Sequence, residues 1–326
     1  MAEEMHSVFH SDKTRIIRSI PKLIEFPFSE ARFLRLVIAL PSNMRANIHI
    51  LILVIGSIFF ASCEDLIEVD VPNGETKLVV EALLYDTDSS HLIKLSTTAP
   101  YFDINPTPRV TGAVVYLLAD NGDSISFAEK TFGTGNYWAD FKIKDSTKYY
   151  LNIVTPGGKK YRSFFEQLFR VPPLELYQND EFLDSIGDFR KQGYYVSLRT
   201  QEPEGVGDYY RWIVFVNGEK LIDPQFFWVA DDLLVDGNVI DEFPQFFIYG
   251  MLPGDSVEIH QTSISARSYH YWVLLQEQVF NQGSPFDTPP ASIEGNITNL
   301  TDPNEVVLGL FSLSRLEKDQ ITVKAK

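Results

Sequence analysis

The sequence is poor in cysteine and in positive charge. Cysteine occurs once among the 326 residues, so no disulfide can form within the chain, and hydrophobic cores must supply its stability. Lys and Arg number 28 against 44 Asp and Glu, which gives a formal net charge of −16. Nucleic acids and anionic lipid headgroups bind to basic patches, so we expect neither as a partner.

Histidines are too scattered to form a zinc site. His91, His260 and His270 are the histidines that follow the cysteine, and none has a second histidine four residues away or a cysteine nearby. We therefore expect no metal and no cofactor.

Catalytic motifs are also sparse. The segment Gly254-Asp255-Ser256-Val257 resembles the nucleophile block of lipase-like hydrolases. Such enzymes place this serine near the start of an α/β domain and need a later Asp and His. Here the segment precedes a strand pattern, so we interpret it as a turn. We expect no catalytic residues and no enzyme, and a hydrolase is the least favoured function.

The chain has one long apolar run, from Ile48 to Phe60, which follows Arg45 and ends in Ala61-Ser62. A positive residue, a short apolar run and small residues are typical of a secretory signal peptide, and the run is too short for a comfortable membrane span. The segment from Phe60 to Cys63 resembles a bacterial lipobox, so we expect lipidation at Cys63. The alternatives are an uncleaved signal anchor and a plain signal peptide with an incidental cysteine.

The predicted lipid anchor also divides the N-terminal part of the chain into segments. Met44 lies directly before Arg45, so we interpret 44–62 as the signal peptide and 1–43 as a mis-called upstream extension, with a real cytoplasmic arm as the alternative. Glu64 and Asp65 resemble the surface-export signal of Bacteroidota lipoproteins. Residues 63–76 are acidic and contain a turn signal, which predicts a tether.

From residue 77 the pattern predicts a mainly β protein of two β-sandwich-like domains. Short alternating runs separated by turn residues predict a sandwich over 77–171 that resembles immunoglobulin-like or transthyretin-like folds. Two prolines at 172–173 predict the boundary of a second β-rich domain over 172–326. One amphipathic α-helix is expected in it, over about 265–282, because Tyr269, Trp272 and Gln276 recur at helical spacing.

Two groups of side chains could bind a ligand. Tyr269, Tyr271 and Trp272 could form a platform for a sugar or a protein, although burial of the helix against a sheet is the preferred interpretation. An acidic segment could hold calcium through oxygen ligands, but a solvated acidic hairpin is the preferred interpretation. Its members are Asp231, Asp232, Asp236, Asp241 and Glu242.

Four segments together are similar to a Bacteroidota lipoprotein family called domain of unknown function 4249. They are 269–278, 285–290, 293–297 and the Leu308-Gly309-Leu310-Phe311 block. The resemblance implies an outer-membrane lipoprotein, lipid-anchored and facing the cell surface, encoded beside a TonB-dependent transporter. We expect a non-catalytic accessory or ligand-binding partner of such a transporter. A structural or adhesive surface lipoprotein without a transport role is the alternative.

Overall fold

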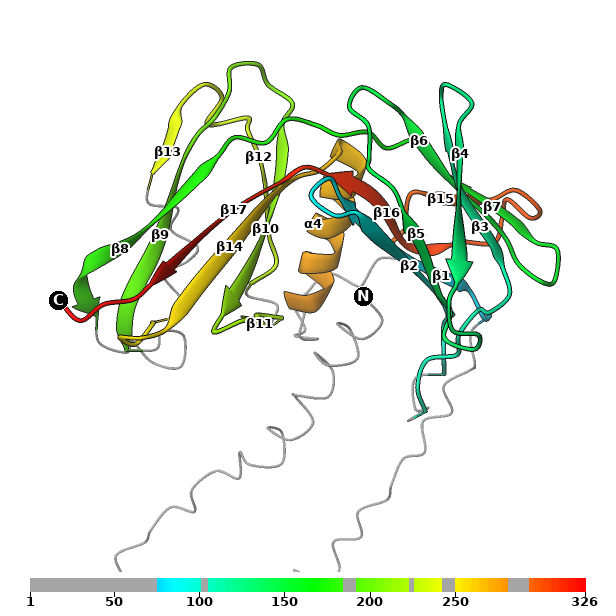
Figure 1. Cartoon of the computed structure of the whole chain (residues 1–326), viewed down its shortest axis with the longest axis horizontal. Coiled ribbons are helices and arrows are strands. Elements are labelled where there is room, and N and C mark those ends of the chain that lie inside the picture. The colour runs from blue at the N-terminus through cyan, green and yellow to red at the C-terminus, as the bar shows by residue number, and fades with distance from the viewer. Residues whose placement is uncertain (1–74, 101–104, 184–191, 223–225, 242–249, 281–292) are drawn as a thin grey trace, which may run out of the picture. The chain divides into compact units, whose positions relative to one another are not determined.

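The computed structural model describes residues 75–100, 105–183, 192–222, 226–241, 250–280 and 293–326. Strands predominate in these residues, so the predicted mainly β architecture with one helix is confirmed (Figure 1). The upstream extension, the signal peptide and nearly all of the tether lie outside the described residues. No helix in the described ranges has the length and apolar character needed to cross a membrane.

The first sheet has nine strands in the order β15-β7-β6-β3-β4-β5-β2-β1-β16. Neighbouring strands are antiparallel, except that β1 and β16 are parallel. The strands are β1 (Leu78–Tyr85), β2 (Ser90–Thr97), β3 (Val114–Ala119), β4 (Ser124–Glu129), β5 (Asn136–Asp140), β6 (Tyr149–Val154), β7 (Lys160–Ser163), β15 (Ile297–Asn299) and β16 (Leu308–Ser314).

Both edge strands of this sheet come from one short C-terminal stretch. Thr298 of β15 forms an isolated bridge with Val306, which lies just before β16. The two edges therefore come together, and the sheet curls around its own core. Alternation sets which side chains enter that core, because every second residue of a strand points to the same face. In β1, Leu78, Val80, Ala82 and Leu84 are buried.

Two smaller sheets share a second core. The five-stranded sheet has the order β11-β10-β14-β17, with β12 also paired to β10, and the three-stranded sheet has the order β13-β9-β8. Leu198 of β9, Trp212 of β10 and Ile259 of β14 belong to the same buried cluster. The strands are β8 (Leu174–Leu183), β9 (Gly193–Gln201), β10 (Tyr209–Val216), β11 (Glu219–Lys220), β12 (Trp228–Asp231), β13 (Val239–Asp241), β14 (Ser256–Ser263) and β17 (Leu316–Thr322).

Helix α4 (Ala266–Phe280) lies between the two β regions (Figure 1). Ser265 caps it, since its hydroxyl oxygen accepts the Ser268 backbone N–H at 3.2 Å. The helix buries Trp272 and Leu275 in a small core that also contains Leu310 of β16. Residues of β10 and β12 pack against the same core, so the helix fills the space between the sheets.

The two-domain division at residues 171–172 remains a prediction. The structure adds that β15 and β16 complete the sheet of the N-terminal segment. A single residue, Arg315, separates β16 from β17 of the five-stranded sheet. At the predicted linker, the Pro172 carbonyl accepts a hydrogen bond of 2.8 Å from the Gln261 side chain. The chain therefore crosses between the two β regions near Pro172, where the bond from Gln261 anchors it, and again at Arg315, between β16 and β17.

Candidate functional site

The aromatic residues considered as a ligand platform are largely buried in α4. Trp272 is 2% exposed and Tyr271 is 5% exposed, and their rings meet edge to face. The guanidinium of Arg211 stacks over the Trp272 ring at 3.6 Å from its centroid. Tyr269 is half-buried and packs against Tyr209. Tyr271 and Trp272 therefore support the core and do not offer an open stacking surface.

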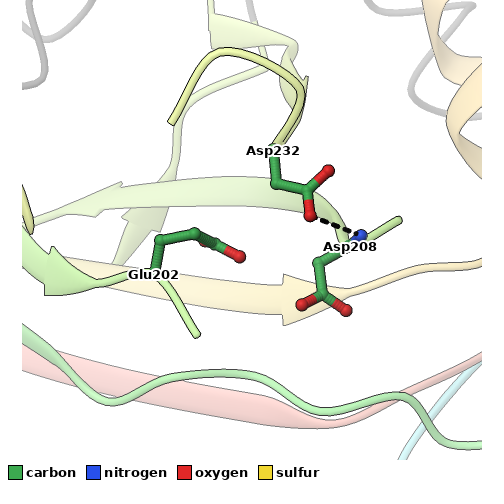
Figure 2. Close-up of side chains that lie close together, drawn as sticks. All are labelled: Glu202, Asp208 and Asp232. Atoms are coloured by element: carbon green, nitrogen blue, oxygen red, sulfur yellow. Dashed lines mark hydrogen bonds between the residues drawn. The ribbon is translucent and has the colours of Figure 1, made fainter. Parts of the chain in front are cut away.

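Three buried carboxylates lie close together at one end of the second core, and they form the candidate site. Glu202, Asp208 and Asp232 each place one oxygen within 4.8 Å of the others. Glu202 and Asp208 lie on the loop between β9 and β10, and Asp232 begins the turn after β12. In Figure 2 the Glu202 side chain extends toward the two aspartates.

The loops that carry these residues are joined through carboxylates. The Oδ2 of Asp232 accepts the backbone N–H of Gly207 at 2.8 Å and that of Asp208 at 3.0 Å. Figure 2 shows the bond to Asp208. Asp236 accepts the backbone N–H of Gly205 at 2.6 Å. These bonds fix the 202–208 loop against the turn and hold Asp208 and Asp232 side by side.

One cation borders the cluster. The Arg170 Nε donates to Asp208 Oδ2 at 2.6 Å, and its guanidinium also donates to the carbonyls of Glu204 and Gly205 at 2.9 Å. The Arg170 side chain is 47% exposed, so it closes the cluster from the solvent side. The ion pair with Asp208 raises the pKa of the arginine.

Glu202 is the most unusual member of the cluster. It is 1% exposed, and its Oε1 accepts the Tyr210 hydroxyl at 2.9 Å. Its Oε2 is buried and has no hydrogen-bond partner within the described part of the chain. Burial, together with the neighbouring charges of Asp208 and Asp232, raises the pKa of Glu202 to about 7.

A second buried carboxyl, Glu166, lies apart from this site. Its Oε1 accepts the Ser265 hydroxyl at 2.9 Å and the Asn296 amide at 3.1 Å. Burial raises the pKa of Glu166 to about 8, so the group is mostly protonated at neutral pH. Glu166 therefore links the N-terminus of α4 to the segment before β15, and we interpret it as a residue that stabilises the fold.

The other residues singled out from the sequence are dispersed. Asp255 accepts the Leu252 backbone N–H at 2.8 Å in a turn before β14, and Ser256, the first residue of β14, accepts the Gln320 side chain, so this segment is a turn that leads into a strand, as expected. His91 is buried against the Phe141 carbonyl, and burial lowers its pKa. Cys63, Glu64 and Asp65 lie outside the described residues.

Of the acidic segment considered for calcium, Asp232 alone among its described members enters the cluster. Asp241 pairs with Arg199 at 2.7 Å, and Glu242 lies outside the described residues. Sequence reasoning did not single out Glu202 and Asp208, which flank a loop with two glycines directly after a strand. That local pattern is visible in the sequence, but the approach of Asp232 depends on strand pairing between β10 and β12.

Comparison with known protein families shows which family the sequence is similar to. The family described as "Domain of unknown function (DUF4249)" has a sequence model that matches residues 64–320. No curated protein matches the chain. The matched region contains the described strands, except the last two residues of β17, together with helix α4 and the carboxylate cluster.

Proposed function

The chain belongs to the DUF4249 family, and from this premise we propose that it is a lipid-anchored, non-catalytic partner of a TonB-dependent transporter at the outer membrane. Support for the anchor comes from the apolar run that ends at Cys63. Glu64 and Asp65 support display at the cell surface. Multiple acyl chains on one cysteine would make the attachment stable.

The observation that carries the docking role is an exposed apolar tip, defined here as Val206, Leu233 and Leu234. Their side chains are 63%, 66% and 91% exposed. They lie on the same two loops that the carboxylate bonds hold together, so the tip is ordered before it meets a partner. Exposed apolar side chains with a polar rim are typical of protein-interaction sites, and a preordered tip loses little conformational entropy on binding.

The anchor is tested by labelling with a fatty-acid analogue. We expect the wild-type protein to carry the label and to sediment with membranes, and Cys63→Ala to lose both properties. Unchanged labelling of Cys63→Ala would refute lipidation at this residue.

The docking role is tested by purifying the tagged full chain from detergent-solubilised outer membranes of its native host. We expect a TonB-dependent transporter to co-purify with the wild type in near-stoichiometric amount. The double variant Leu233→Asp, Leu234→Asp should recover no transporter. Leu300→Asp is the matched control, because Leu300 is 53% exposed beside β15, in the other β region. Labelled protein that recovers no transporter would instead favour the structural or adhesive role.

A further inference from the structure

We propose that Glu202, Asp208 and Asp232 bind a divalent cation, calcium in preference to magnesium, between the 202–208 loop and the turn after β12. This site goes beyond the docking role, and neither proposal requires the other. The three residues are 1%, 8% and 1% exposed, so the cation would lie beneath the surface of the loops.

Charge balance is the first argument for a cation. When all three carboxylates are ionised they carry three negative charges, and Arg170 supplies one positive charge through its bond to Asp208. The formal remainder is two negative charges in a buried place, where uncompensated charge is costly. A divalent cation neutralises this remainder.

The unpaired oxygen of Glu202 is the second and independent argument. A protonated Oε2 would bury an O–H donor that has no acceptor among the described residues, and an ionised Oε2 would bury a charge without a hydrogen bond. Both states are unfavourable. A cation placed among the three carboxylates pairs with this oxygen while Tyr210 continues to donate to Oε1.

The chemistry of the donors selects the ion. Carboxylate oxygens are hard ligands, which suit calcium and magnesium and not the soft metals that prefer thiolate. Magnesium needs near-ideal octahedral geometry and gives up its waters reluctantly, whereas calcium accepts an irregular set of carboxylate and water ligands. The three carboxylates are buried and their oxygens lie within 4.8 Å of one another, so a bound ion must exchange several waters for carboxylates, which calcium does more readily. Water would complete the coordination.

Calcium titration of the purified exported chain, after removal of metal with a chelator, tests the site. We expect saturable binding by calorimetry with a dissociation constant on the order of 10⁻⁴–10⁻³ M, as in extracellular calcium modules. Saturating calcium should raise the melting temperature by several degrees, because the ion binds the folded state alone. Magnesium at the same concentration should bind at least tenfold more weakly.

Glu202→Gln localises the binding, because glutamine keeps an oxygen for the Tyr210 hydroxyl and removes the charge at Oε2. We expect at least a tenfold loss of calcium affinity with an unchanged melting temperature in the chelator. Glu204→Gln is the matched control, because Glu204 is exposed in the same loop and lies outside the cluster. Absence of saturable calcium binding to the wild type, or equal affinity of the wild type and Glu202→Gln, would overturn the proposal.

Discussion

Glu166 is a carboxylic acid buried where three segments meet, and its protonation links fold stability to pH. Its backbone forms a bridge with Tyr149 at the start of β6, and its side chain accepts hydrogen bonds from Ser265 and Asn296. Burial raises its pKa to about 8 in the folded chain, against an ordinary value of 4.5. Between these values the folded state keeps a proton that the unfolded state releases.

The sign of the pH effect follows from this difference. The stabilising contribution of Glu166 is complete below the unfolded pKa, and it is lost as pH rises through the folded pKa of about 8. We expect the wild type to lose up to a few kcal/mol of stability between about pH 5 and pH 8, at about 1.4 kcal/mol per unit of pKa shift. Glu166→Gln should not show this loss, because glutamine does not titrate. Urea unfolding at three pH values measures this. Glu175→Gln, at an exposed position, is the control, and parallel curves for wild type and Glu166→Gln would contradict the assignment.

Trp272 is the largest side chain in the core beneath α4, and its removal should be costly. It is 2% exposed and lies under the guanidinium of Arg211. We expect Trp272→Ala to reduce the free energy of unfolding by about 3–5 kcal/mol, the usual range for a buried large aromatic residue. Phe280→Ala on the same helix is the control, because Phe280 is 51% exposed. Equal effects of the two changes in a thermal melt would show that Trp272 is not a core residue.

At the scale of elements, the parallel pairing of β1 with β16 depends on Gly309. This residue has a φ of +93°, and a Cβ there would clash with the Val80 carbonyl. Alanine therefore introduces both backbone strain and a steric conflict with β1. We expect Gly309→Ala to cost several kcal/mol, beyond the roughly 1–3 kcal/mol for a strained φ alone.

Gly122 separates these two causes. Its φ is +92°, and a Cβ there would meet no described atom within 4 Å. We expect Gly122→Ala to show the cost of strain without the clash, so it should destabilise the fold clearly less than Gly309→Ala in chemical unfolding. Similar losses for the two variants would contradict the close contact between the strands.

Local patterns predicted the elements well and their contacts poorly. The helix expected over about 265–282 is Ala266–Phe280, because helical period and the Ser265 cap are encoded within the segment itself. The buried face is Ser268, Tyr271, Trp272 and Leu275. Of the residues that predicted the helix, Trp272 is therefore buried, whereas Tyr269 and Gln276 are half-buried. Which face is buried depends on β10, β12 and β16, strands of two sheets that pack against the helix, and the period of one segment does not encode those contacts.

The candidate site shows the same limit. Asp232 was recognisable as part of an acidic turn, and the interpretation of that turn as a solvated hairpin did not anticipate its burial. Its approach to Glu202 and Asp208 requires the antiparallel register of β10 with β12. Long-range register of this kind follows from the assembled sheet, and a single sequence does not reveal it.

At the scale of the whole molecule, the two β regions are closely connected. Strands β15 and β16 complete the N-terminal sheet, α4 packs against both regions, and the predicted linker is bonded to Gln261. These connections allow the protein to present the 202–208 loop and the turn after β12 in a fixed arrangement. The exposed apolar tip and the buried carboxylate cluster occupy the same pair of loops, so this end of the molecule is where we expect contact with a partner.

Site-specific photo-crosslinking in living cells tests the central claim, which is docking of the apolar tip on a TonB-dependent transporter. A photoreactive amino acid is placed at Leu234, which is 91% exposed, and in a separate variant at Phe132, which is 81% exposed near the end of β4 in the nine-stranded sheet. We predict one dominant adduct from position 234 that contains the transporter, and no such adduct from position 132. Absence of the transporter adduct at position 234, or the same adducts from both positions, would contradict the account.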